Sequence, residues 1–169
     1  NNITDFAKCR FGPNIKTLVH YEWPSGIETK KKSNGLVIAK DSNVLPIIEL
    51  ALVDTPGEGK VVAFTNSMVN MEGGVHVDAA MKAIKTNILN RINKALSKSL
   101  GSKNGKVGPR LTATDLKRHL SIIITYRAIY AKFGGQTKEK LVSPKPNIVI
   151  EESRFNCIRN WNLVERLIK

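Results

Sequence analysis

A long stretch of apolar residues at helical spacing, set between segments rich in branched apolar residues, constrains the fold most strongly. From position 76 to position 100, apolar residues recur every three or four positions. These residues are Val77, Ala80, Met81, Ile84, Ile88, Ile92, Ala95 and Leu96. The spacing predicts one long amphipathic helix from about His76 to Leu100, with one face available to cover a sheet.

Three apolar segments are predicted as the main strands of that sheet. Pro46–Val53 and Val61–Val69 are separated by turn-forming residues at 54–59, a pattern that predicts a hairpin of two central strands. Leu120–Tyr130 is dense in isoleucine and predicts a third strand. The order of these elements indicates an α+β fold with a mixed sheet and helices packed on one face.

Shorter elements are predicted at both ends of the chain. Residues 2–11 have the spacing of a helix that Asn2 or Thr4 can cap, and 17–23 reads as a strand. Three lysines, 30–32, are expected at the tip of an exposed hairpin. Thr112 or Thr114 is expected to cap a short segment that ends at His119, residues 148–150 to form a short strand, and the last residues a helix.

Length and charge narrow the class of protein. The chain has 169 residues and an apolar share of 41%, enough for one domain with a core. Lys and Arg outnumber Asp and Glu by 27 to 14, a net charge of +13, which favours polyanionic partners such as nucleic acid. No apolar run approaches the roughly 20 residues needed to cross a bilayer, so we expect no membrane partner.

The cysteines and the chain ends bear on where the protein works. Cys9 and Cys157 are too few for a disulfide scaffold, which favours a reducing intracellular setting with both thiols packed inside. The chain starts at Asn1 without an initiator Met and stops at Lys169 within an apolar helical pattern. We therefore expect a piece of a longer polypeptide.

A polar tripeptide at 136–138 is the main candidate for a functional site. Gln136, Thr137 and Lys138 follow Gly134 and Gly135, where the backbone can approach a partner closely. A lysine ammonium on such a loop suits phosphate oxygens. The sequence carries no phosphate-binding loop of the GKS or GKT type and no dinucleotide fingerprint, so any further part of a nucleotide site must come from another domain. The three histidines and two cysteines have no metal-ligand spacing, and no metal site is predicted.

Two motifs in order give a resemblance to a known family. Residues 64–69 (FTNSMV) and 72–78 (EGGVHVD), followed by QTKE at 136–139, resemble the transducer domain of type IIA DNA topoisomerases. The residues of these motifs resemble those of the eukaryotic and the large-virus or phage enzymes more than those of bacterial gyrase. The likeness covers 46–169, whereas residues 1–45 match poorly. It implies a single transducer domain whose fold is like the second domain of a small-subunit ribosomal protein, with a left-handed βαβ crossover.

The resemblance also implies a role for the tripeptide. In this family an ATP-binding domain precedes the transducer, and the loop lysine reaches across to the γ-phosphate. By motif that lysine is Lys138, with Gln136 beside it, so Lys138 is the expected catalytic residue and both residues are expected to contact ATP. ATP and Mg²⁺ would be bound mainly by the missing ATPase domain, and this fragment alone is expected to be inactive. Asn66, Ser67 and the 73–74 glycines are expected to be structural, with His76 hydrogen-bonded to the first turn of its helix.

A basic loop after the long helix is the second candidate. It resembles by position the lysine loop that touches DNA in the eukaryotic enzymes, although its lysines are dispersed here. The residues expected to contact double-stranded DNA are Lys98, Lys103, Lys106 and Arg110. The resemblance further implies a DNA-cleavage domain that follows, a homodimeric parent, and an intracellular location that is nuclear in a eukaryote and cytoplasmic or at a viral replication site otherwise.

Two alternatives stay open. The chain could be the corresponding domain of a bacterial gyrase B or of a MutL-type ATPase, each of which also delivers a lysine. It could instead be a ribosomal-like nucleic-acid-binding module whose charge serves RNA or DNA without a nucleotide. An ATP-binding domain upstream of Asn1 would separate the second alternative from the topoisomerase interpretation.

Overall fold

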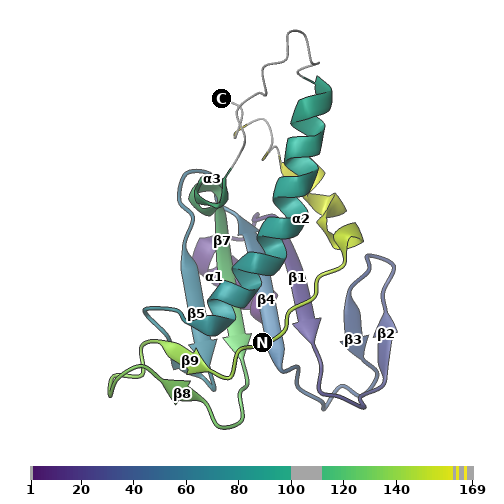
Figure 1. Ribbon diagram of the computed structural model, residues 1–169. Coiled ribbons are helices and arrows are strands. Elements are labelled where there is room, and N and C mark those ends of the chain that lie inside the picture. The colour runs from purple at the N-terminus through teal and green to yellow at the C-terminus, as the bar shows by residue number, and fades with distance from the viewer. Residues whose placement is uncertain (1, 100–111, 162, 164–165, 167–169) are drawn as a thin grey trace.

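A five-stranded sheet organises the molecule (Figure 1). The computed structural model describes residues 2–99, 112–161, 163 and 166, with the side chains of 94–99 and 113 left out. The strands lie in the order β1-β4-β7-β5-β6. Their bounds are Thr17–Glu22 for β1, Ile48–Asp54 for β4, Leu120–Tyr126 for β7, Val61–Thr65 for β5 and Met68–Val69 for β6. The β5–β7 pair is parallel and the other pairs are antiparallel, so the predicted mixed sheet is confirmed.

The predicted hairpin of β4 and β5 is wrong, because β7 lies between these two strands and pairs with both. The link at 54–59 bonds instead to the end of the helix before β7: the amide of Thr55 donates to the carbonyl of His119 at 3.0 Å, and that of Gly59 to Arg118 at 3.1 Å. A Cβ built on Gly59 would lie 1.7 Å from the carbonyl oxygen of Lys117. The turn residues between the two apolar runs therefore reverse the direction of the chain, but the two strands do not pair with each other. Each pairs with β7, which follows much later in the sequence.

The predicted strand at 61–69 is also divided. Asn66 and Ser67 have φ angles of 48° and 70°, which turn the chain back so that β6 pairs antiparallel with β5. Two successive residues with positive φ are typical of tight hairpin turns, and asparagine tolerates this backbone better than most residues with a Cβ.

The long helix forms as predicted. Helix α2 spans Val75–Ser99 and lies across one face of the sheet. It connects the parallel strands β5 and β7, and the connection in Figure 1 runs in the left-handed sense. Alternate sheet residues on this face, such as Leu50 and Ile124, form one core with Ile84 and Ile88 of α2. The residues that face each other between α2 and the sheet therefore recur about every 3.6 positions on the helix and every second position on the strands.

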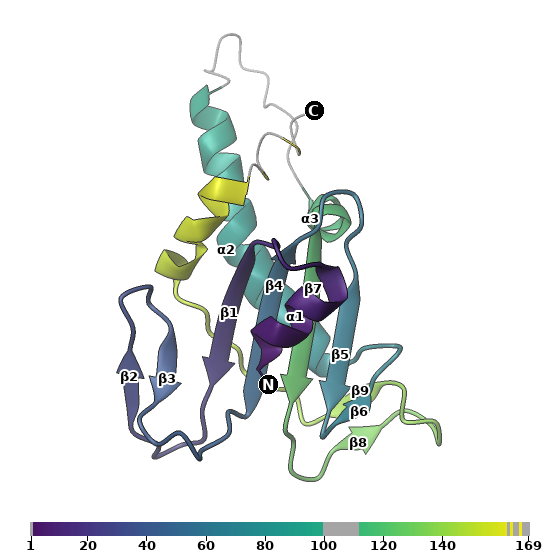
Figure 2. The same cartoon turned by 180° about the vertical axis from the view of Figure 1, so that it is seen from behind.

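A second helix covers the other face of the sheet. Helix α1, Ile3–Phe11, begins at Asn2, which forms a capping box with Asp5, as its sequence favours. Figure 2 shows α1 in front of the sheet and α2 behind it. Ile3 and Ala7 pack there against sheet residues that alternate with those under α2. The sheet is therefore covered on both faces, with the larger cluster under α2, and the expectation of helices on one face alone is wrong, because α1 buries the alternate sheet residues.

Short elements complete the described chain. Helix α3 spans Ala113–His119 and is capped by Thr112, one of the two predicted caps. Strands β2 and β3 form the expected hairpin, in which the exposed strand β2 carries Lys30 and Lys31 and β3 is partly buried. Strands β8 and β9 form a second hairpin. Strand β2 spans Thr29–Lys31, β3 spans Val37–Ala39, β8 spans Lys132–Phe133 and β9 spans Leu141–Ser143. The 3-10 helix η1 spans Glu152–Trp161.

Two further expectations are corrected at the C-terminal side. The third strand ends at Tyr126 and not at 130. Residues 148–150 form no strand, because side chains take up their backbone groups: the amide of Val149 donates to Glu22 at 3.0 Å, and the carbonyl of Ile150 accepts from Asn87 at 3.3 Å. The expectation of packed thiols is also wrong, since Cys9 and Cys157 are both exposed.

Candidate functional site

The predicted tripeptide lies at the tip of the hairpin formed by β8 and β9, which we call the lysine hairpin and which spans 132–143 (Figure 1). Gln136, Thr137 and Lys138 are all exposed. The amide of Gly134 donates to the carbonyl of Lys140 at 2.9 Å and closes the base of the turn. Lys138 has a φ of 55°, an uncommon value for a residue with a Cβ.

The segment at 70–74, which we call the β6–α2 loop, lies directly against the lysine hairpin. The side-chain amide of Asn70 donates to the carbonyl of Lys138 at 3.1 Å. Backbone bonds run in both directions, from the amide of Glu72 to the carbonyl of Glu139 at 3.0 Å and from Leu141 to Gly73 at 3.1 Å. The two motifs that are far apart in sequence therefore meet at one end of the sheet.

Close backbone approach explains the second glycine of the β6–α2 loop. Gly74 pairs with Leu141 in an isolated parallel bridge and has a φ of 137°. A Cβ at this position would lie 2.3 Å from the carbonyl oxygen of Leu141. No other residue type fits this contact without a backbone shift, so the glycine is needed for the loop and the hairpin to touch.

Asn66 has a structural role of the kind expected from the sequence. Its side chain donates to the carbonyl of Ala128 at 2.8 Å and accepts from the amide of Ala128 at 2.9 Å. This pair of bonds ties the β5–β6 turn to the chain that leads from β7 to the lysine hairpin. The β5–β6 turn is thereby held by the backbone of Ala128, which belongs to neither β5 nor β6.

His76 is enclosed at the start of α2. Its side chain is 0% exposed and its ring stacks on that of Tyr126, with 6.3 Å between centroids. Neither ring nitrogen has a hydrogen-bond partner among the described residues, so the bond expected with the helix turn does not form. Burial lowers the pKa of His76 from 6.5 to about 4, against the opposite influence of Asp78. His76 is therefore neutral at pH 7 and is enclosed within the packed layer.

The residues predicted to contact DNA fall largely outside the described part of the chain. Lys103, Lys106 and Arg110 lie within 100–111, for which no placement is described. Lys98 lies within α2, but the structure does not describe its side chain. Their contact with DNA stays a prediction.

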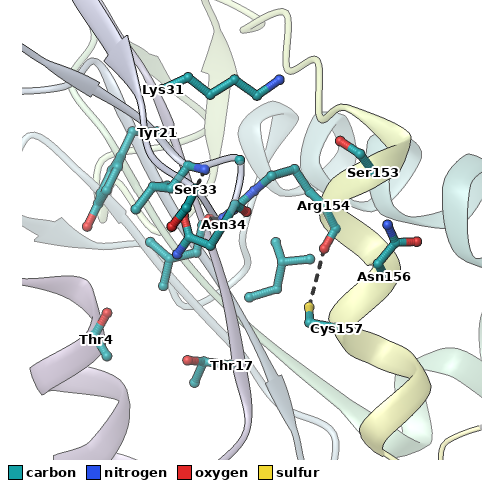
Figure 3. A pocket seen from close by; sticks show the side chains of 14 residues that line it. Thr4, Thr17, Tyr21, Lys31, Ser33, Asn34, Ser153, Arg154, Asn156 and Cys157 are labelled. Carbon is teal, nitrogen blue, oxygen red and sulfur yellow. Dashed lines mark hydrogen bonds between the residues drawn. The ribbon is translucent and has the colours of Figure 1, made fainter.

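A pocket of about 760 Å³ lies at the other edge of the sheet, between β1, the β2–β3 hairpin and η1 (Figure 3). Its cationic groups are engaged within the protein. Lys31 pairs with Glu151 at 2.6 Å, and the guanidinium of Arg154 donates to the carbonyls of Val19 and Asn34. Figure 3 shows Arg154 extending from η1 towards Asn34. These bonds join η1 to β1 and the hairpin, and we assign no phosphate to this pocket.

The described residues also bear on metals and membranes. No group of three or more His, Cys, Asp or Glu side chains is placed to hold a metal ion within the described ranges. In the same part of the chain, no helix combines the length and the apolar character needed to cross a membrane.

Asn70 is a site residue that the sequence did not single out. It is 3% exposed and lies between β6 and the two glycines, inside the span of the upstream motif. The one sequence feature that could have drawn attention to Asn70 is its position as a polar residue between an apolar strand and a pair of glycines. Its partner at 138 could not be read from the sequence, because 68 positions separate the two.

Comparison with known proteins gives a consistent result. A family model described as DNA gyrase B matches residues 2–161. The chain is 26% identical over 124 residues to a DNA topoisomerase 2 of Pisum sativum, covering 71% of this chain and 8% of that protein. It is 25% identical over 142 residues to a DNA gyrase B protein of Archaeoglobus fulgidus, covering 75% of this chain and 21% of that protein. The chain thus spans a small part of these relatives.

One solved structure shows the same fold. The crystal structure of the ATPase and transducer domains of DNA topoisomerase II from Balamuthia mandrillaris aligns with a TM-score of 0.54 and 18% identity. The alignment covers 75% of this chain and 31% of that one. At this identity the match supports the fold alone.

Proposed function

Because this chain belongs to the DNA gyrase B family, we propose that it is the transducer domain of an ATP-dependent type II DNA topoisomerase. The observation that carries the proposal is the junction between the β6–α2 loop and the lysine hairpin. This junction holds the backbone of Lys138 against the start of α2 while its side chain stays exposed. Residues 1–169 form one such domain within a longer protein.

Lys138 contacts the γ-phosphate of ATP bound by a preceding domain, with Gln136 beside it. The two side chains are exposed, which fits a phosphate that another domain holds and does not fit a complete nucleotide site in this chain. ATP with Mg²⁺, bound mainly by that other domain, supplies the phosphoryl group that is transferred. The lysine ammonium stabilises negative charge on that group as a fixed cation and not as a base. Alone, the chain hydrolyses no ATP.

The junction offers a route from the phosphate to the rest of the domain. The carbonyl of Lys138 is bonded to Asn70, and the carbonyl of Gly73 to the amide of Leu141, just before α2 begins. When the γ-phosphate leaves, the hairpin loses its contact with the nucleotide domain, and the two domains can rotate relative to each other. This motion couples hydrolysis to the passage of one DNA duplex through another.

The remaining partners follow from charge and family. Lys98, Lys103, Lys106 and Arg110 contact phosphates of the transported duplex, in keeping with the net charge of +13. The whole protein is an intracellular homodimer with a DNA-cleavage domain after this one, nuclear if the source is a eukaryote. Its relatives include both topoisomerase II and gyrase B, so the proposal covers either branch. The described residues add nothing that favours a MutL-type or ribosomal-like module.

The test replaces Lys138 by alanine in the complete protein and measures ATP turnover with and without DNA. Loss of a well-placed electrostatic stabiliser costs about 3 kcal/mol in the transition state, so turnover should fall by about a hundredfold. Lys140→Ala is the matched control, because it removes the same charge from another exposed position of the same hairpin. Equal turnover in the Lys138 and Lys140 variants would refute the proposal.

A further inference from the structure

We propose that Asn70 is a positioning residue for Lys138 and that Thr65 fixes Asn70 in the orientation this requires. The inference rests on the proposed function, because it concerns how the phosphate-contacting lysine is held. It concerns two side chains that lie inside the domain and cannot themselves reach a nucleotide. Thr65 is 0% exposed and Asn70 is 3% exposed.

The hydrogen bonds of Asn70 fix its side chain at both ends. The hydroxyl of Thr65 donates to Oδ1 of Asn70 at 2.6 Å, and Nδ2 of Asn70 donates to the carbonyl of Lys138 at 3.1 Å. A backbone carbonyl can only accept, so the nitrogen of the amide must face Lys138 and the oxygen must face Thr65. The two bonds therefore define one orientation of the amide.

The backbone of Asn70 is held as firmly as its side chain. Its amide donates to the carbonyl of Ala63 in β5 at 2.8 Å, and its carbonyl accepts from Gly73 at 3.0 Å. Thr65 is the last residue of β5, a strand paired with β7 inside the sheet. Asn70 thus links the rigid sheet to the lysine hairpin.

Lys138 needs such a support because of its backbone. Its φ of 55° is unfavourable for a residue with a Cβ, and the tip of the hairpin around it is exposed. A bond to its carbonyl restrains the peptide from which the side chain starts. A charged group stabilises a transition state only when it is held in the right place, so freeing this peptide should reduce catalysis even though the lysine is still present.

The two hydrogen bonds of the Asn70 side chain stabilise the lysine hairpin as well as the core. A buried threonine–asparagine pair could be replaced by apolar side chains of similar shape without leaving either partner unpaired. The second bond of Asn70, however, goes to the backbone of an exposed loop. A positioning role predicts that this bond matters only while Lys138 is present, whereas a purely structural role predicts the same effect with or without the lysine.

The test is a double-mutant cycle in the complete protein, with ATP turnover as the readout. Asn70→Ala should lower kcat by about tenfold or more, because it removes the restraint on Lys138. In a protein that already carries Lys138→Ala, adding Asn70→Ala should lower kcat no further. Asn87→Ala is the matched control: it removes side-chain amide bonds to the carbonyls of Ala83 and Ile150, but its site is three turns along α2 and should leave kcat unchanged.

The outcomes separate this inference from the function on which it rests. If Lys138→Ala leaves turnover unchanged, the proposed function fails. If Lys138→Ala lowers turnover while Asn70→Ala does not, or if the two losses multiply, the positioning role is overturned and the proposed function stands. Should Asn70→Ala fail to fold, Thr65→Val takes its place, since it keeps the shape and removes only the hydroxyl; parent-like turnover in that variant would also overturn the inference.

Discussion

The backbone of Gly74 passes so close to Leu141 that a Cβ on the glycine would lie 2.3 Å from the carbonyl oxygen of the leucine. This contact joins the start of α2 to the end of the lysine hairpin. Together with the bond from Asn70 to Lys138, it makes one unit of the β6–α2 loop and the hairpin. The phosphate-sensing role proposed above depends on this connection.

Replacing Gly74 by alanine should therefore destabilise the domain strongly. The added Cβ meets three backbone atoms of Leu141 at 2.3–2.9 Å, and φ is 137°. We expect a loss of about 2–4 kcal/mol in the free energy of unfolding, measured by urea denaturation. Gly57→Ala is the control, because φ is also positive there but nothing lies within 4 Å of the new Cβ; it should cost about 1 kcal/mol. Equal losses in the two variants would contradict the account of the contact.

Burial of His76 should make the stability of the domain depend on pH. Its pKa is lowered to about 4 in the folded state from 6.5, so the unfolded chain binds an additional proton between these values. The contribution of neutral His76 to the free energy of unfolding is fully present above pH 6.5. It is lost as the pH falls towards 4, and the total loss is about 3 kcal/mol.

The measurement compares the parent with His76→Phe, which keeps an aromatic ring beside Tyr126 but cannot titrate. Between pH 7 and pH 5 the parent should lose about 2 kcal/mol more than the variant in its free energy of unfolding. Subtracting the two pH profiles isolates the contribution of His76, because every other titratable side chain is common to both proteins. Parallel pH profiles would show that His76 is not buried as neutral imidazole.

Neutralising the basic loop should change how the domain binds DNA. With Lys98, Lys103 and Lys106 all replaced by alanine, the slope of log affinity against log salt should flatten by about 2–3, since each phosphate contact contributes about 0.9. The loss should be similar for all DNA sequences. The control replaces Lys8 and Arg10, two basic residues of α1, which lies on the face of the sheet opposite to α2. An unchanged slope in the loop variant would exclude the loop from the DNA interface.

Local patterns predicted the elements of this fold well. The apolar spacing placed the start of α2 to within one residue of Val75, whereas its predicted end at Leu100 lies outside the described residues. The caps Asn2 and Thr112 mark the starts of α1 and α3. Such features depend on residues three or four positions apart, which the sequence displays directly. The α+β class followed from the order of these elements.

Pairing and contacts between distant segments could not be predicted in this way. The insertion of β7 between β4 and β5 depends on where the chain returns after α2, and alternation in Pro46–Val53 is the same whichever strand lies beside it. The strands of the lysine hairpin have two and three residues, too few for a periodic signal. The motif match proposes Lys138 as a site residue, and its role stays a prediction. The hydrogen bond from Asn70 to its carbonyl could be found only when both segments were placed in space.

The most direct test of the central claim compares nucleotides that differ only in the γ-phosphate. In the complete protein, Lys138→Ala should weaken binding of a non-hydrolysable ATP analogue by about tenfold, because a charge-assisted bond is worth about 1.5–3 kcal/mol. Binding of ADP should be unchanged. An equal loss for both nucleotides, or no loss for either, would contradict a contact between Lys138 and the γ-phosphate.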